Sequence, residues 1–186
     1  VTTDKSERLE AEIVVIGIGI LPETGLAQRA GLAVDNGIIV DEFCRTSSPD
    51  VFAAGDNTCH RNTFVGSSVR LEAWQCAQNM AIAAAKIMCG DETPYHEVPW
   101  MWSDQFDANL QIAGVPINWD NIVIRGNPAN GSFIGFVLEN GRISGAISIN
   151  QPRDMRLARR MMDAGKLFSA DELADEAISI RELSKR

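Results

Sequence analysis

The sequence predicts an α/β plus α+β fold class, with an α/β region up to about residue 95 and a smaller mixed region after it. Three observations support this prediction. Short β-branched runs alternate with helix-forming stretches in the first half. A proline-bounded segment at residues 93–99 separates the two regions. Four strand-like runs followed by two helical patterns fill the second half.

The first α/β elements are short. The apolar run Ile13–Leu21 is interrupted by glycines and predicts a buried strand that leads into a turn. Leu26–Leu32 predicts a short helix that stops at a glycine. Gly37–Phe43 follows an Asp-Asn-Gly turn signal, so we expect another strand there.

The α/β region ends in a long helix. A short strand at Val51–Ala54 and a loop rich in Asn, Thr and Ser to about Ser68 are expected first. Leu71–Cys89 then lacks Gly and Pro and is full of good helix formers, so it predicts the longest helix of the chain, ended by Gly90. Its alanine-rich middle indicates close packing against a neighbour.

The second region is predicted to be strands followed by helices. The expected strands are Leu110–Val115, Asn121–Arg125, Ser132–Leu138 and Arg142–Ile149. Asn140-Gly141 separates the last two and is a strong hairpin signal. The helical pattern from Arg153 ends near Gly165, and Ser169 with Glu172 predicts a capping box that starts another helix.

Composition narrows the function classes. The net charge of −8 argues against general nucleic-acid binding, which needs a basic surface to displace counterions. No apolar run approaches the ~20 residues of a membrane helix, and no signal peptide is recognisable, so we expect neither nucleic-acid nor membrane partners. The four cysteines have no metal-ligand spacing, which indicates free thiols in a reducing cytoplasm and no metal site.

The segment Thr46–Asp56, TSSPDVFAAGD, carries the strongest motif. Gly55 would allow the backbone to approach a ligand closely, and Asp56 presents a carboxylate that suits a sugar-like hydroxyl. On pattern alone, a strand that ends in Gly-Asp is also typical of a plain turn. The segment resembles the second flavin motif of the two-dinucleotide-domain flavoprotein reductases, and this resemblance implies that Asp56 binds the ribityl chain of FAD.

Two further segments continue this resemblance. Val14–Thr24 holds only a lone G-x-G, without the third glycine of a dinucleotide fingerprint. It resembles the end of the NADH domain in these reductases, which implies that the backbone at Ile16 and Gly17 borders the nicotinamide nucleotide. The start of the long helix, at Glu72, Ala73 and Trp74, offers free N–H groups and a positive dipole end.

In the family this helix start contacts the flavin ring. The alternative is that Glu72 only complements the helix dipole and that Trp74 lies in the core. Residues 99–105, PWMWSDQ, would ordinarily indicate an apolar patch against a neighbouring domain. The string also resembles the oxygenase-coupled ferredoxin reductase branch, which implies that Trp102 lies near the flavin and the ferredoxin-docking edge.

A group of arginines could serve the same partner. The group lies on one predicted helix and consists of Arg153, Arg156, Arg159 and Arg160. Because ferredoxins are usually acidic, such a basic patch could steer docking on an otherwise acidic protein. The alternative is a solvated helix face paired with Asp154 and Asp163.

The resemblance implies an FAD-dependent reductase that passes electrons from NAD(P)H through the flavin to a 2Fe–2S ferredoxin, which serves a Rieske or haem-thiolate oxygenase. It also implies three parts: the end of the NADH domain at 1–24, the rest of the FAD domain at 25–95, and a C-terminal α+β domain at 96–186. Since neither G-x-G-x-x-G fingerprint is present, we expect the C-terminal portion of a longer reductase, with exposed apolar area and self-association. The alternatives are a flavin-free interaction or dimerisation module, and a rubredoxin or monodehydroascorbate reductase.

Overall fold

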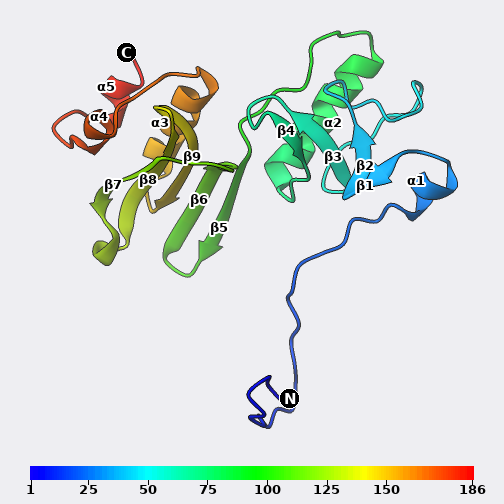
Figure 1. Cartoon of the computed structure of the whole chain (residues 1–186), viewed down its shortest axis with the longest axis horizontal. Helices are drawn as coiled ribbons and strands as arrows, with labels where there is room; N and C mark the ends of the chain where they lie inside the picture. Colours follow the sequence, from blue (N-terminus) through cyan, green and yellow to red (C-terminus); the bar gives the residue numbers. More distant parts are fainter.

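The computed structural model describes all 186 residues and contains two separate β-sheets, each covered by its own helices (Figure 1). The first sheet has four strands in the order β1-β2-β3-β4, with β2 and β3 parallel and the outer pairs antiparallel. Its elements are α1 (Gly25–Arg29), β1 (Val34–Asp35), β2 (Gly37–Val40), β3 (Thr58–Asn62), β4 (Ser67–Val69) and α2 (Trp74–Met88).

The second sheet is fully antiparallel and has the order β5-β6-β9-β8-β7. Helix α3 packs on β9 and β6, while α4 packs near β7 (Figure 1). The elements are β5 (Trp100–Gln105), β6 (Ala108–Gly114), β7 (Asn121–Asn127), the short 3-10 turn η1 (Pro128–Asn130), β8 (Ser132–Glu139), β9 (Arg142–Ile149), α3 (Pro152–Asp163), α4 (Ala170–Ala174) and α5 (Ile180–Leu183).

Helix α2 forms where good helix formers run without interruption. Its buried residues, Cys76, Met80, Ala84 and Ile87, recur every three or four positions and so lie on one face of the helix. Met80 and Ala84 pack with Val40, Cys44 and Tyr95 in the core of the first sheet. Gly90 follows the helix with φ of +96°, a conformation that suits glycine and ends the helix as predicted.

Local sequence signals also explain the turn, the helix cap and the buried helix face in the second half of the chain. Asn140 and Gly141 both have positive φ and join β8 to β9 in the predicted hairpin. Ser169 and Glu172 form the predicted capping box at the start of α4. Four side chains of α3 are almost completely buried and build the larger core against the sheet: Met155, Ala158, Met161 and Met162.

Three predicted elements differ from the structure. Ile13–Leu21 pairs with no strand of this chain and is exposed throughout, so the prediction of a buried strand was wrong for this chain. The predicted strand Val51–Ala54 is reduced to one isolated bridge, between Arg45 and Phe52. The predicted loop before Ser68 instead contains β3 and β4, and the buried Thr58 and Asn62 of β3 find hydrogen-bond partners within the fold.

The structure contains no helix that is long and apolar enough to cross a membrane.

Candidate functional site

Two tryptophans from different sheets meet at the start of α2. Trp74 is the first residue of α2, and Trp102 lies in β5, the edge strand of the second sheet. Their rings meet edge to face, with centroids 6.0 Å apart. Trp74 is 65% exposed and Trp102 is 38% exposed, so the pair forms an aromatic wall that is open on one side. The alternative that placed Trp74 in the core is therefore wrong.

The N-terminus of α2 beside this wall has no side-chain cap. Ala73 occupies the capping position and cannot accept a hydrogen bond from the first turn. Glu72 pairs with Arg70 instead of with the helix. The backbone N–H groups of the first turn, together with the positive end of the helix dipole, are thus available to an electron-rich group.

Gly55 and Asp56 lie next to the same helix turn. The φ of Gly55 is +95°, and a Cβ added there would stand 3.6 Å from Cβ of Ala77 in α2. Asp56 is exposed. Burial raises the pKa of the Cys76 thiol in α2, and the nearby Asp56 carboxylate raises it further, by less. The structure thus gathers the flavin-motif pair, the α2 start and Trp102 in one place.

Ile16 and Gly17 lie apart from this group. They belong to the extended segment that leaves the first sheet and runs away from both sheets (Figure 1). Ile16 is 75% exposed, and a Cβ at Gly17 would meet no atom within 4 Å. Their contact with a nicotinamide nucleotide stays a prediction.

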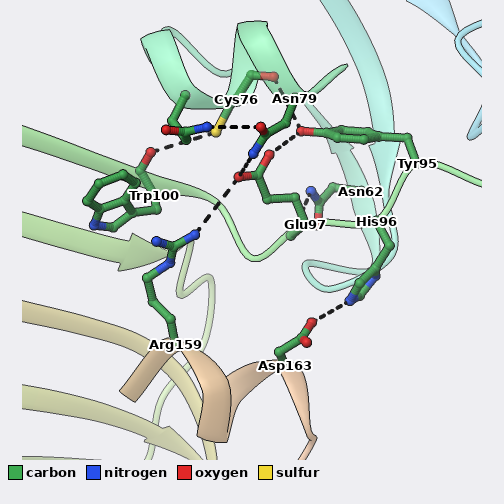
Figure 2. A network of polar contacts seen from close by, with 10 residues as sticks. Asn62, Cys76, Asn79, Tyr95, His96, Glu97, Trp100, Arg159 and Asp163 are labelled. Carbon is green, nitrogen blue, oxygen red and sulfur yellow. Dashed lines mark hydrogen bonds and ion pairs between the residues drawn. The ribbon is translucent and has the colours of Figure 1, made fainter. Parts of the chain in front are cut away.

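The sequence did not reveal a buried polar network at the junction of the two sheets. Figure 2 shows Glu97, in the segment between α2 and β5, surrounded by donors from both sides. Its carboxylate accepts hydrogen bonds from Tyr95 Oη at 2.6 Å and from Asn79 Nδ2 at 2.8 Å, and Arg159 approaches to 4.0 Å. An acidic residue inside the apolar string YHEVPW was the one available signal.

This network is buried and electrostatically constrained. Glu97 is 8% exposed, and its backbone carbonyl accepts a hydrogen bond from Asn62 of β3. Burial, and then the hydrogen bond to Glu97, raise the pKa of the Tyr95 hydroxyl far above its usual range. The Tyr95 hydroxyl therefore keeps its proton and donates it in the hydrogen bond to Glu97.

The four arginines of α3 are not equivalent. Arg153, Arg156 and Arg160 are exposed, whereas Arg159 is half-buried. Asp163, suggested as an arginine partner, instead bonds to Nε2 of His96 at 2.8 Å (Figure 2). A cavity of about 360 Å³ opens between α2 and α3; its lining includes Asn79, His96, Glu97, Arg156, Arg159 and Arg160.

Comparison with known proteins identifies the family. Residues 1–81 match the model of the pyridine nucleotide-disulphide oxidoreductases, and residues 100–184 match the model of the reductase C-terminal domain. These matches fall on the two sheets in chain order. The first part of the chain is therefore similar to the pyridine nucleotide-disulphide oxidoreductases, and the second part to the reductase C-terminal domain. Both the predicted family and the predicted ferredoxin reductase branch are confirmed by the matches and by the relatives below.

Proteins similar to the chain include two ferredoxin reductases that are named for the systems they belong to. The ferredoxin–NAD(+) reductase component of the anthranilate 1,2-dioxygenase system of Burkholderia cepacia is 45% identical over 182 residues, which are 97% of this chain and 45% of that protein. The ferredoxin reductase for the CYP199A2 system of Rhodopseudomonas palustris is 33% identical with a TM-score of 0.93, over 98% of this chain and 45% of that one.

A second similar structure is the covalent complex of putidaredoxin reductase with putidaredoxin. It is 32% identical with a TM-score of 0.91 and covers 97% of this chain and 43% of that one. The chain therefore spans slightly less than half the length of the relatives that it matches.

The residues present fit the flavin end of FAD, the cofactor of this family. The aromatic wall suits a flat ring, the uncapped N–H groups of α2 suit the carbonyl oxygens of the ring, and Asp56 can accept from hydroxyl groups. Gly55 keeps the backbone beside Asp56 free of a side chain. All four cysteines of the chain are free thiols.

Proposed function

We propose that the protein is an FAD-dependent ferredoxin–NAD(+) reductase of an oxygenase system and that this chain supplies the flavin-side wall and the C-terminal domain. The observation that carries the proposal is the meeting of Trp74 and Trp102 at the uncapped start of α2, beside Asp56. We further propose the three-part division at residues 24 and 95 and a cytoplasmic location, which agrees with four unpaired cysteines.

Each residue of the site has a role in this proposal. FAD, when bound, supplies the chemistry that accepts a hydride from NAD(P)H and releases electrons singly. Asp56 holds the ribityl hydroxyl groups, and Gly55 lets the backbone approach them. The first turn of α2, at Glu72, Ala73 and Trp74, directs its N–H groups at the ring and favours added negative charge there.

We also propose a docking face for the electron acceptor. Trp102 is half-exposed on the edge strand β5. It pairs with Gln111 of β6, and both side chains lie on the face of the sheet that α3 covers. The exposed arginines of α3 therefore lie on the same side of the sheet as Trp102. A 2Fe–2S ferredoxin with an acidic surface fits this combination. The solved complex of putidaredoxin reductase with putidaredoxin supports the same class of partner.

Flavin titration tests the proposal. We expect FAD to quench the tryptophan fluorescence of the chain, because Trp74 and Trp102 would stack or abut on the ring. Asp56→Ala should weaken binding about 10-fold or more, the effect of losing one to two hydrogen bonds to a charged acceptor. Asp50→Ala, another exposed carboxylate in the preceding loop, is the matched control and should bind FAD like the unchanged chain.

Equal FAD affinity of the Asp56→Ala and Asp50→Ala chains would contradict the site. If the chain bound ferredoxin but showed no quenching by FAD, the flavin-free interaction module would be the better reading.

A further inference from the structure

Arg159, Trp100 and Trp102 form a continuous stack. The Arg159 guanidinium carbon lies 4.4 Å from the centroid of the Trp100 ring. The Trp100 and Trp102 rings are stacked at 4.9 Å with an interplanar angle of 27°. Trp102 then meets Trp74 edge to face. The row runs from α3 of the second sheet to the start of α2, which belongs to the first.

The guanidinium at the end of this row is held from two sides. Glu97 approaches one of its terminal nitrogens, and Glu97 is itself fixed by Tyr95 and Asn79 (Figure 2). Nε of Arg159 is buried and has no hydrogen-bond partner. The guanidinium is therefore held by its position over the Trp100 ring and by Glu97, and not by a hydrogen bond from Nε.

Trp102 needs such support. It lies in the edge strand β5, which has a neighbour on one side alone, and 38% of its surface is exposed. An exposed side chain ordinarily changes rotamer on the ps–ns timescale. Its ring stacks on Trp100 and meets Trp74 edge to face, so a displacement of Trp100 removes one of its two aromatic contacts.

We propose that Arg159 is a positioning residue: its guanidinium clamps Trp100, and Trp100 holds Trp102 in the orientation that the flavin-side wall requires. The consequence for electron transfer rests on the proposed function, whereas the clamp itself does not. Arg159 thus differs from Arg156 and Arg160, which are exposed and lie over no aromatic ring.

The clamp requires a planar cation. Arg159→Lys keeps the charge but loses the flat face that stacks on an indole. A cation–π contact of this kind shifts the ratio of clamped to free side chain by about 2- to 30-fold. Arg181→Lys is the matched control, because Arg181 is exposed on α5 and contacts no ring.

The first measurement needs no flavin. Stacked indoles couple their transitions, so circular dichroism of the chain should show an exciton signal from Trp100 and Trp102. We expect Arg159→Lys to reduce this signal at least about twofold and Arg181→Lys to leave it as in the unchanged chain. An undiminished signal in Arg159→Lys would overturn the clamp.

The second measurement uses the FAD-loaded reductase with a 2Fe–2S ferredoxin as acceptor. Arg159→Lys should lower the limiting rate of ferredoxin reduction at least about twofold and leave KM for ferredoxin unchanged. A raised KM with an unchanged limiting rate would assign Arg159 to docking and overturn its positioning role. If the unchanged reductase failed to reduce ferredoxin, the proposed function would be wrong. The circular dichroism measurement would still test whether Arg159 positions Trp100.

Discussion

The Glu97 network gives a sharp test of what holds the two sheets together. Tyr95→Phe removes one oxygen atom and leaves the ring packed in the core, where Tyr95 is 6% exposed. The change deletes the 2.6 Å hydrogen bond to Glu97 and leaves a buried carboxylate with one donor fewer. A hydrogen bond to a charged group contributes about 1.5–3 kcal/mol, and no cavity term adds to it because no methylene is lost.

The ion pair of Glu97 with Arg159 should matter much less. The two charges are 4.0 Å apart, and 28% of the Arg159 side chain is exposed, so solvent screens the pair. Such pairs contribute about 0.2–1 kcal/mol in double-mutant cycles. The free energy that couples Glu97 to Tyr95 should therefore exceed the one that couples Glu97 to Arg159.

Urea unfolding followed by tryptophan fluorescence measures both couplings. Two cycles share Glu97→Gln, one with Tyr95→Phe and the other with Arg159→Gln. For a chain of 186 residues, Tyr95→Phe should also lower Tm by about 3–12 °C. If the Arg159 cycle gave the larger coupling, or if Tyr95→Phe cost less than about 0.5 kcal/mol, charge attraction and not the buried hydrogen bond would hold the junction.

Two further predictions concern buried basic side chains. His60 is 3% exposed, neither ring nitrogen has a hydrogen-bond partner, and burial lowers its pKa. Below about pH 6.5 the unfolded chain binds this proton and the folded chain does not, so His60 should reduce stability by up to about 1.4 kcal/mol per pH unit as the pH falls. Urea unfolding of the unchanged chain and of His60→Phe across this range checks it, since the variant should lack that part of the slope. Arg125 donates to the carbonyl oxygens of Leu173, Asp175 and Ile178, at 2.7, 3.0 and 2.6 Å. Arg125→Met should cost at least about 3 kcal/mol of unfolding free energy and speed proteolysis after residue 170, whereas Arg153→Met on the exposed face of α3 should stay within about 0.5 kcal/mol.

Each of these two predictions has an outcome that would contradict it. Parallel pH slopes for the unchanged chain and His60→Phe would mean that His60 accepts a proton in the folded state. Equal stability of the two Met variants would mean that water replaces the Arg125 hydrogen bonds at no cost.

Signals that depend on neighbouring residues could be read from the sequence, and signals that depend on distant ones could not. The Asn140-Gly141 turn and the Ser169 cap rest on contacts within three residues, and both were predicted correctly. Strand β3 was missed because TCHRN is polar, and its burial becomes acceptable only when Asn62 bonds to the carbonyl of Glu97, which lies 35 positions away.

The site shows the same division. Gly55, Asp56 and Trp102 could be proposed from the sequence because each belongs to a local motif, and their roles stay predictions. The clamp escaped the sequence, because Arg159 looked like one more arginine of a helix face until the fold placed it on Trp100. The exposure of Ile13–Leu21 has a similar cause: its apolar residues have no pairing strand within this chain, whatever their local preference.

The junction of the two sheets combines apolar and directional contacts, and the directional ones decide the geometry of the wall. Phe64, from the β3–β4 turn, joins the larger core and packs under the Arg142 guanidinium, but apolar contacts of this kind tolerate sliding. The bonds of Glu97 to Tyr95 and Asn79 are short and directional. The Asn79 bond ties the segment before β5 to α2, whereas the Tyr95 bond lies within that segment. Because Trp74 belongs to one sheet region and Trp102 to the other, their edge-to-face angle of 84° reports the alignment of the two. Loosening Glu97 should therefore change this angle before it unfolds either sheet, so stability and wall geometry depend on the same buried carboxylate.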